Sequence, residues 1–185
     1  MKSTMKTMTL SLTVLTVLVG AALGAVNYLT AGPIAEGALR ARHEALAAVL
    51  PPFDNDAFGD RTERDGCTVY PAEKDGDKVG AAVESYSDNG FGGRINVLFG
   101  FDASGKVLAY KVLSHSETPG LGANMQTWFD DEDTGHTVLG TSVPLKVKAD
   151  GGEIDAMAGA TISSRAFLEA LNRAREVLTT YTTER

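Results

Sequence analysis

The hydrophobic pattern of this chain begins with a long uncharged stretch near the amino terminus. From residue 7 to residue 35 there is no Asp, Glu, Lys, Arg or His. Residues 8–29 are mostly apolar or small, and a helix of about 22 residues measures roughly 33 Å, which is long enough to span the hydrocarbon core of a membrane. Lys2 and Lys6 are the only charges before this stretch. By the positive-inside rule they place the amino terminus in the cytoplasm.

This pattern predicts a cytoplasmic segment over residues 1–7 and a transmembrane helix over residues 8–30, with the rest of the chain beyond the membrane. A cleaved signal peptide is the alternative, because a positive start followed by small residues such as Ala21, Ala22 and Ala25 also suits one. The apolar run is longer than the usual signal-peptide core, which favours the uncut anchor.

The next segment, residues 31–66, is predicted to be a helix followed by a linker. Gly32 and Pro33 interrupt the apolar pattern, and residues 34–50 place apolar side chains on one helical stripe. Two consecutive prolines then end this helix. The remainder of the segment is rich in Asp, Asn and Arg and is expected to be a loop.

Alternating apolar and polar residues predict two hairpins in the following part of the chain. The first joins strands over residues 67–70 and 79–85, and the second joins strands over residues 95–101 and 106–113. A glycine-rich loop at residues 89–93 lies between the two hairpins. Each hairpin turn contains a glycine, as tight turns often do.

The carboxyl-terminal part combines a long irregular segment, residues 114–141, with a short strand at 145–147 and a last helix at 163–178. The side chains expected on the buried face of this helix are Phe167, Leu171, Ala174 and Leu178. Hairpins with helices at both ends indicate an α+β domain over residues 67–185, with a mostly antiparallel sheet and flanking helices.

Composition excludes several functions. Seventeen basic against 24 acidic residues give a net charge of −7, whereas nucleic-acid binding normally needs a basic surface. The single cysteine, Cys67, excludes an intrachain disulfide and a metal site with several thiolates. His115 and Glu117 lack a third ligand nearby, and the acidic run at residues 130–133 lacks the spacing of a calcium loop. We therefore expect no metal site, and no arrangement of residues indicates a hydrolase.

The segment at residues 155–165 leads from small residues directly into the last helix. Helix N-termini bind anions through their unpaired N–H groups and the helix dipole, and phosphate is the usual ligand. Thr161, Ser163 and Ser164 add hydroxyl groups at the same end. The segment is therefore a candidate phosphate site. The alternative is a simple N-cap serine beside a tight glycine turn, which the spacing alone favours because such caps open most helices.

A second segment of interest is residues 115–122, His-Ser-Glu-Thr-Pro-Gly-Leu-Gly. Pro119 and Gly120 form a strong turn signal, and Gly122 leaves the backbone bare enough for a planar ligand to approach. A loop that follows a strand and precedes a long irregular segment suits a binding site. The alternative is an ordinary turn, which this segment taken alone favours.

Taken together, the two segments resemble a known family. The pattern Glu-Thr-Pro-Gly-Leu-Gly, followed about forty residues later by Asp-x-x-x-Gly-Ala-Thr-x-Ser-Ser-Arg, is similar to the FMN-binding domain of the Rnf G subunit and of the C subunit of the sodium-pumping NADH:quinone reductase. The resemblance extends over nearly the whole chain, including the amino-terminal span and the closing helix. The length of this chain favours the Rnf G subunit, because the quinone reductase subunit is typically longer before the Glu-Thr-Pro loop.

The resemblance implies a covalent cofactor. In that family FMN is held by a phosphoester to the threonine that matches Thr161, and a separate flavin transferase makes the bond by consuming FAD. The residues implied in cofactor binding are Glu117, Thr118, Pro119, Gly120, Leu121, Gly159, Ala160, Thr161, Ser163 and Ser164. The family usually has Ser or Thr where this chain has Ala158, so one hydroxyl is missing before Gly159.

The resemblance further implies an electron relay in a bacterial inner membrane complex, with the flavin domain on the periplasmic side. The Rnf complex links reduced ferredoxin and NAD to sodium or proton translocation, so the enzyme is the whole translocase and no catalytic residue is assigned to this chain. Its expected partners are the other membrane subunits, the transferase and membrane lipid. The alternatives are the quinone reductase subunit and a membrane-anchored binding module without a redox cofactor.

Overall fold

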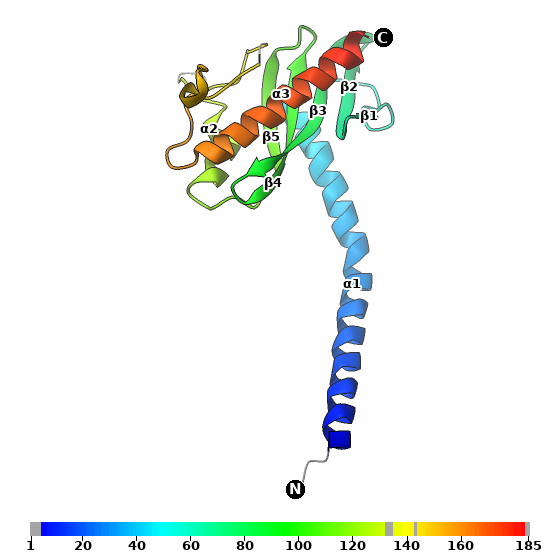
Figure 1. Cartoon of the computed structure of the whole chain (residues 1–185). Helices are drawn as coiled ribbons and strands as arrows, with labels where there is room; N and C mark the ends of the chain where they lie inside the picture. Colours follow the sequence, from blue (N-terminus) through cyan, green and yellow to red (C-terminus); the bar gives the residue numbers. More distant parts are fainter. Residues whose placement is uncertain (1–4, 132–134, 143, 184–185) are drawn as a thin grey trace. The chain divides into compact units, whose positions relative to one another are not determined.

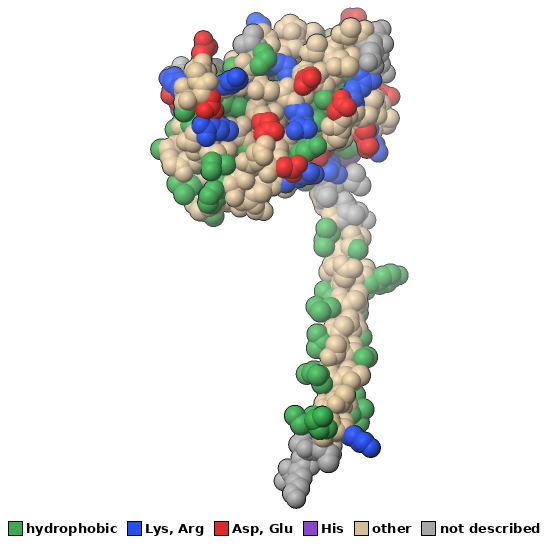
Figure 2. Space-filling model, viewed as in Figure 1, with side chains coloured by type: hydrophobic (Ala, Val, Ile, Leu, Met, Phe, Trp, Pro, Cys, Tyr) green, Lys and Arg blue, Asp and Glu red, His purple; other side chains and the backbone are tan. Residues whose placement is uncertain are grey.

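The computed structural model describes residues 5–131, 135–142 and 144–183, which form two compact units divided between His43 and Glu44. The first unit is the larger part of α1, Met5–Val49. Its stretch Met5–Ile34 has a mean hydropathy of 2.1 and is long and apolar enough to cross a membrane. Apolar side chains lie on the outside of this helix (Figure 2), with none of the stretch buried against protein. The expected apolar amino-terminal helix is therefore present.

The prediction of a break at Gly32 and Pro33 was wrong, because α1 is continuous and contains Pro33. Proline lacks an N–H and so removes one helical hydrogen bond. The many regular turns on both sides keep their own hydrogen bonds. One missing bond is thus tolerated here. The helix ends at Val49, just before the two prolines, as expected.

The second unit is built on a five-stranded antiparallel sheet whose strands follow one another in space as they do in sequence (Figure 1). The strands are β1 Thr62–Arg64, β2 Cys67–Lys74, β3 Asp77–Gly90, β4 Gly93–Asp102 and β5 Val107–Ser114. With the helices beside it, this sheet confirms the predicted α+β class.

Strand β1 lies where a loop was expected, so that prediction was wrong for three residues. The sequence Thr-Glu-Arg has no apolar alternation to reveal a strand. It pairs with β2 because Asp65 and Gly66 adopt positive φ angles of 51° and 76° and turn the chain back on itself. Pairing between backbones, rather than burial of side chains, makes this short strand.

Alternate residues of the central strands enter two separate cores, one on each face of the sheet. The last turns of α1 cover one face, where Leu46 and Val49 pack with Leu98 of β4. Gly100 allows this approach, because a Cβ there would clash with the Val49 carbonyl oxygen. The other face packs against α3, Thr161–Thr183. The sheet is thus buried on both sides.

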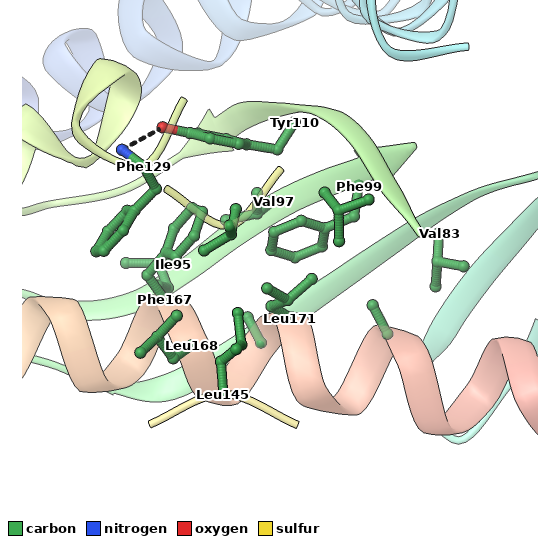
Figure 3. Close-up of a cluster of buried hydrophobic side chains, with 14 of the residues drawn as sticks. Val83, Ile95, Val97, Phe99, Tyr110, Phe129, Leu145, Phe167, Leu168 and Leu171 are labelled. Carbon is green, nitrogen blue, oxygen red and sulfur yellow. Dashed lines mark hydrogen bonds between the residues drawn. The ribbon is translucent and has the colours of Figure 1, made fainter. Parts of the chain in front are cut away.

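Helix α3 lies across its face of the sheet and supplies much of the main core (Figure 3). It begins two residues before and ends five residues after the expected helix, and all four side chains predicted on its inner face are buried. Phe167 stacks on Phe129, with ring centroids 4.3 Å apart, and meets Tyr110 edge-on at 4.8 Å. Cys67 is also buried, only 1% exposed.

In its described residues, the long segment between β5 and α3 contains three short helices: η1 Gly122–Asn124, α2 Met125–Trp128 and η2 Lys148–Asp150. The expected strand at residues 145–147 is reduced to one parallel bridge between Val147 and Ile154. Trp128 stacks on His136 and donates from Nε1 to the Asp155 carbonyl at 3.1 Å. This side chain therefore anchors the segment. Glu132 and Asp133 of the acidic run lie outside the described residues.

Candidate functional site

The two motifs of the sequence meet at one cavity of about 330 Å³ at the beginning of α3. Three parts of the chain form its wall: the β3–β4 turn, the loop after β5, and the first turn of α3. The lining residues are Phe91, Glu117, Thr118, Leu121, Gly122, Gly159, Ala160, Thr161, Ile162 and Ser163. This volume falls at the lower end of the roughly 300–1,000 Å³ typical of ligand sites.

The Glu117 carboxylate connects these three parts of the wall. Its Oε1 accepts a hydrogen bond from the Gly92 N–H at 3.0 Å, and its Oε2 accepts one from the Ser163 hydroxyl at 2.6 Å. The residue is only 5% exposed. Hydrogen bonds to a charged group are stronger than those between neutral groups, so one buried side chain fixes both neighbouring segments.

A tight turn before α3 is closed by Ser164, whose side chain is fully buried. The Ser164 hydroxyl donates to the Ala160 carbonyl and accepts from the Met157 N–H, both at 3.0 Å. Within this turn Gly159 has a φ of 72°, a left-handed conformation that disfavours any side chain. Helix α3 begins directly after this turn, and Thr161 is the first residue of the helix.

Thr161 differs from the two serines of the motif in the state of its hydroxyl group. Ser163 and Ser164 are 2% and 0% exposed, and both hydroxyls are hydrogen-bonded inside the protein. Thr161 is half-buried and lines the cavity, and its hydroxyl has no hydrogen-bond partner among the described residues. It is thus the hydroxyl of the motif that remains available for chemistry.

Backbone donors surround that hydroxyl. Ser164 N–H is bonded to the Ala160 carbonyl at 3.0 Å, whereas the N–H groups of Thr161, Ile162 and Ser163 have no acceptor within the part of the chain that the structure describes. Such first-turn groups carry the positive end of the helix dipole. The arrangement can hold one anionic group, such as a phosphate, against Thr161.

The outer rim of the cavity is apolar. Phe91, Leu121 and Ile162 are 70%, 43% and 49% exposed. In the described residues of the second unit, Leu108 is the only other large hydrophobic side chain with comparable exposure. Three of four such side chains thus surround one cavity, and a cluster of exposed apolar groups is typical of a binding surface.

Not every residue expected at the site reaches the cavity. Glu117, Thr118, Leu121, Gly159, Ala160, Thr161 and Ser163 line it. Pro119, Gly120 and Ser164 do not, and they shape the loop and the turn instead. Gly122, which was expected to leave the backbone open to a planar ligand, also lines the cavity. Phe91 and Ile162 were not expected there, although an aromatic residue inside the glycine-rich turn was a usable signal for Phe91.

Arg165 also belongs to the motif but is directed away from the cavity. It donates from Nε and Nη2 to the Asp150 carboxylate, both at 2.7 Å. These hydrogen bonds hold the pKa of Asp150 below its ordinary value. Arg165 and Asp150 line a larger groove of about 850 Å³ along the side of α3. We assign the site to the smaller cavity because Thr161, the free N–H groups and the apolar rim lie there.

Comparison with known proteins identifies the family of the chain. The FMN-binding domain family matches residues 90–176. The G subunit of the ion-translocating oxidoreductase complex of Photorhabdus laumondii is 36% identical over 191 residues, covering 94% of this chain and 90% of the relative. The G subunit of Salmonella typhimurium is 36% identical over 80% of this chain and 79% of the relative, and that of Stutzerimonas stutzeri is 36% identical over 90% and 78%.

The chain belongs to the G-subunit family of ion-translocating oxidoreductase complexes. This confirms the resemblance to the Rnf G subunit. In this member of the G-subunit family, the cavity fits FMN on its own chemistry: free N–H groups for a phosphate, a free hydroxyl at the same place, and an apolar rim for a flat ring. Among the described residues, no group of three or more His, Cys, Asp or Glu side chains could hold a metal ion.

Proposed function

We propose that this chain is the flavoprotein subunit of a membrane-bound, ion-translocating oxidoreductase of the Rnf type and relays electrons through FMN linked to Thr161. The observation that carries the proposal is the free Thr161 hydroxyl among unpaired N–H groups at the start of α3. The names of the relatives and the match to the FMN-binding domain family support the flavoprotein and the complex.

The proposed linkage is a phosphoester formed by a flavin transferase from FAD. The Thr161 oxygen forms the new bond to phosphorus, the pyrophosphate bond of FAD breaks, AMP leaves, and the hydroxyl proton is released. The product keeps one negative charge on phosphate. The N–H groups of Thr161, Ile162 and Ser163 can stabilise that charge, and the helix dipole adds to their effect.

The chain's own residues prepare the cavity for a redox group. When bound, FMN supplies electron transfer in single-electron steps. Phe91, Leu121 and Ile162 offer apolar surface that excludes water from one side of the cavity. Their exposure leaves the site open toward a partner, which suits a relay that passes electrons on and binds no substrate of its own.

We further propose that residues 8–30 anchor the subunit in the bacterial inner membrane. The apolar stretch Met5–Ile34 is long enough to span it. Lys2 and Lys6 favour a cytoplasmic amino terminus, which puts the flavin domain, residues 67–185, on the periplasmic side. Other subunits of the complex, the transferase and membrane lipid are the proposed partners.

The test is co-expression of the full chain with a flavin transferase, followed by a denaturing gel viewed for flavin fluorescence. We expect a fluorescent band for the natural chain and none for Thr161→Val. Thr180→Val is the matched control, because Thr180 is an exposed residue near the far end of the same helix. Its hydroxyl donates to the Glu176 carbonyl at 3.1 Å. A dark natural chain beside an active transferase contradicts the proposal.

A further inference from the structure

Glu117 is a buried charge with an unusual set of contacts. Besides the Gly92 N–H and the Ser163 hydroxyl, which bind its two oxygens at 3.0 and 2.6 Å, its own backbone N–H donates to Nδ1 of His115 at 3.1 Å. Both ends of the residue are therefore held. The side chain joins the β3–β4 turn to the first turn of α3, two segments more than 70 residues apart in the sequence.

Two glycines make room for this carboxylate. A Cβ at Gly90 would lie 2.5 Å from Oε1, and a Cβ at Gly122 would lie 2.5 Å from Oε2. Neither glycine can be replaced without displacing Glu117. The slot therefore fits a carboxylate at the full length of a glutamate side chain.

We propose that Glu117 is a positioning residue of the flavin site. It holds the Phe91 turn and the Thr161 turn as two walls of one cavity, and it leaves a buried negative charge beside that cavity. It also accepts a hydrogen bond from the Ser163 hydroxyl, so the Thr161 hydroxyl is the one left available for attachment of the flavin phosphate. This inference rests on the proposed function, because it assigns Glu117 a role toward the FMN that Thr161 would carry.

Packing alone does not account for such a residue. Burying a carboxylate costs several kcal/mol unless hydrogen bonds compensate for the lost water, and an apolar side chain could fill the slot without that cost. The two donors come from the two walls of the cavity, and the negative charge lies near the positive end of α3, where it is favoured. The negative charge also makes reduction of a group bound in the cavity less favourable, so it lowers the reduction potential of that group.

Two variants of the full chain separate the effect of the length of the Glu117 side chain from the effect of its negative charge. Glu117→Asp keeps the charge but is one methylene too short to reach both donors. Glu117→Gln keeps the length, since its amide can accept from Gly92 N–H and donate to the Ser163 oxygen, but it removes the charge. Three quantities are measured: the rate of loading by the transferase, hydrogen exchange of the unloaded chain over residues 90–93 and 159–164, and the midpoint potential of the loaded chain.

We expect Glu117→Asp to load about tenfold more slowly or worse, as the loss of a charge-assisted hydrogen bond implies, and to exchange faster in both segments. Glu117→Gln should load faster and exchange more slowly than Glu117→Asp, because it keeps both hydrogen bonds, while its midpoint potential shifts to a more positive value than that of the natural chain. The charge control is Glu169→Gln. Glu169 accepts from the buried Ser87 hydroxyl of β3 at 3.0 Å but does not line the cavity, so loading and potential should stay unchanged.

The proposal is overturned if Glu117→Asp loads and exchanges like the natural chain. It is equally overturned if Glu117→Gln leaves the potential unchanged, because the carboxylate would then act through packing alone. A natural chain that never loads counts against the proposed function itself. The exchange experiment needs no flavin, so it still decides whether Glu117 holds the two segments.

Discussion

The Ser163 hydroxyl donates a hydrogen bond to the Glu117 carboxylate at 2.6 Å, although the residues are 46 positions apart in the sequence. This contact joins the two motifs that carry the family resemblance. It also explains why, of the three hydroxyl residues at the helix start, Thr161 is the one whose hydroxyl has no hydrogen-bond partner among the described residues. Ser163 and Ser164 are occupied inside the protein, and Thr161 is left free among the described residues.

Replacement of Gly159 by Ala should impair both stability and loading. With a φ of 72°, any side chain at this position is strained, and the free energy of unfolding should fall by about 1 kcal/mol. The turn also sets the position of Thr161, and a displacement near 1 Å at a reacting group can lower a rate about a hundredfold. We expect loading by the transferase to fall at least severalfold, measured as flavin fluorescence against time.

Gly151→Ala is the control for this effect. Gly151 has nearly the same φ, 78°, in a turn outside the cavity, and open space surrounds its missing side chain. It should lose similar stability in a denaturant titration and load at the natural rate. Equal loading defects in both variants would mean that instability, not the geometry of the turn, limits the reaction.

Addition of the missing hydroxyl should improve loading. Ala158 is exposed, so Ala158→Ser should change the free energy of unfolding by less than about 0.5 kcal/mol. A hydroxyl next to Gly159 offers another hydrogen bond to phosphate or to the transferase, and one net hydrogen bond corresponds to roughly two- to tenfold in rate. Initial loading rates at limiting transferase check this. A slower rate in the serine variant would contradict it.

The stability of the domain should fall in strong alkali because of Tyr110. Its hydroxyl donates to the Met125 carbonyl at 2.8 Å and accepts from the Phe129 N–H at 3.1 Å, and burial raises its pKa. Above pH of about 10 the unfolded chain loses the phenol proton while the folded chain retains it. The free energy of unfolding should therefore decrease by up to about 1.4 kcal/mol per pH unit from this group.

Tyr110→Phe tests that assignment. The variant leaves a buried N–H and a buried carbonyl unpaired, so it should be less stable by about 1–3 kcal/mol at neutral pH. Above pH 10 its stability should fall less steeply than that of the natural chain, in urea titrations at several pH values. Cys67, whose pKa is also raised by burial, contributes equally to both proteins. Parallel curves would rule out Tyr110 as the source.

Much of the fold follows from local patterns. The second hairpin and the inner face of α3 were predictable because alternation and helical spacing reflect which side chains are buried. Strand β1 was not predictable, since three polar residues join the sheet only through a turn with positive φ at Asp65 and Gly66. The continuity of α1 through Pro33 was not predicted. Proline is taken to end a helix because it removes one backbone hydrogen bond, but that expectation does not consider how many hydrogen-bonded turns lie on both sides of the proline.

The site was only partly accessible from the sequence. Thr161 and the loop at Glu117 could be identified from motifs, and they line one cavity. That Glu117 would be buried and bonded to Ser163 depends on how three distant segments pack. The apolar rim could not be foreseen either, because the exposure of Phe91 and Ile162 is a property of the folded surface.

The most direct measurement of the central claim is mass spectrometry of the chain after co-expression with the transferase. The tryptic fragment of residues 149–165 contains Thr161, Ser163 and Ser164 as its only hydroxyl side chains. We expect this fragment to be heavier by one FMN less one water, with fragmentation placing the addition on Thr161. An unmodified fragment beside an active transferase, or an addition on either serine, would contradict the account.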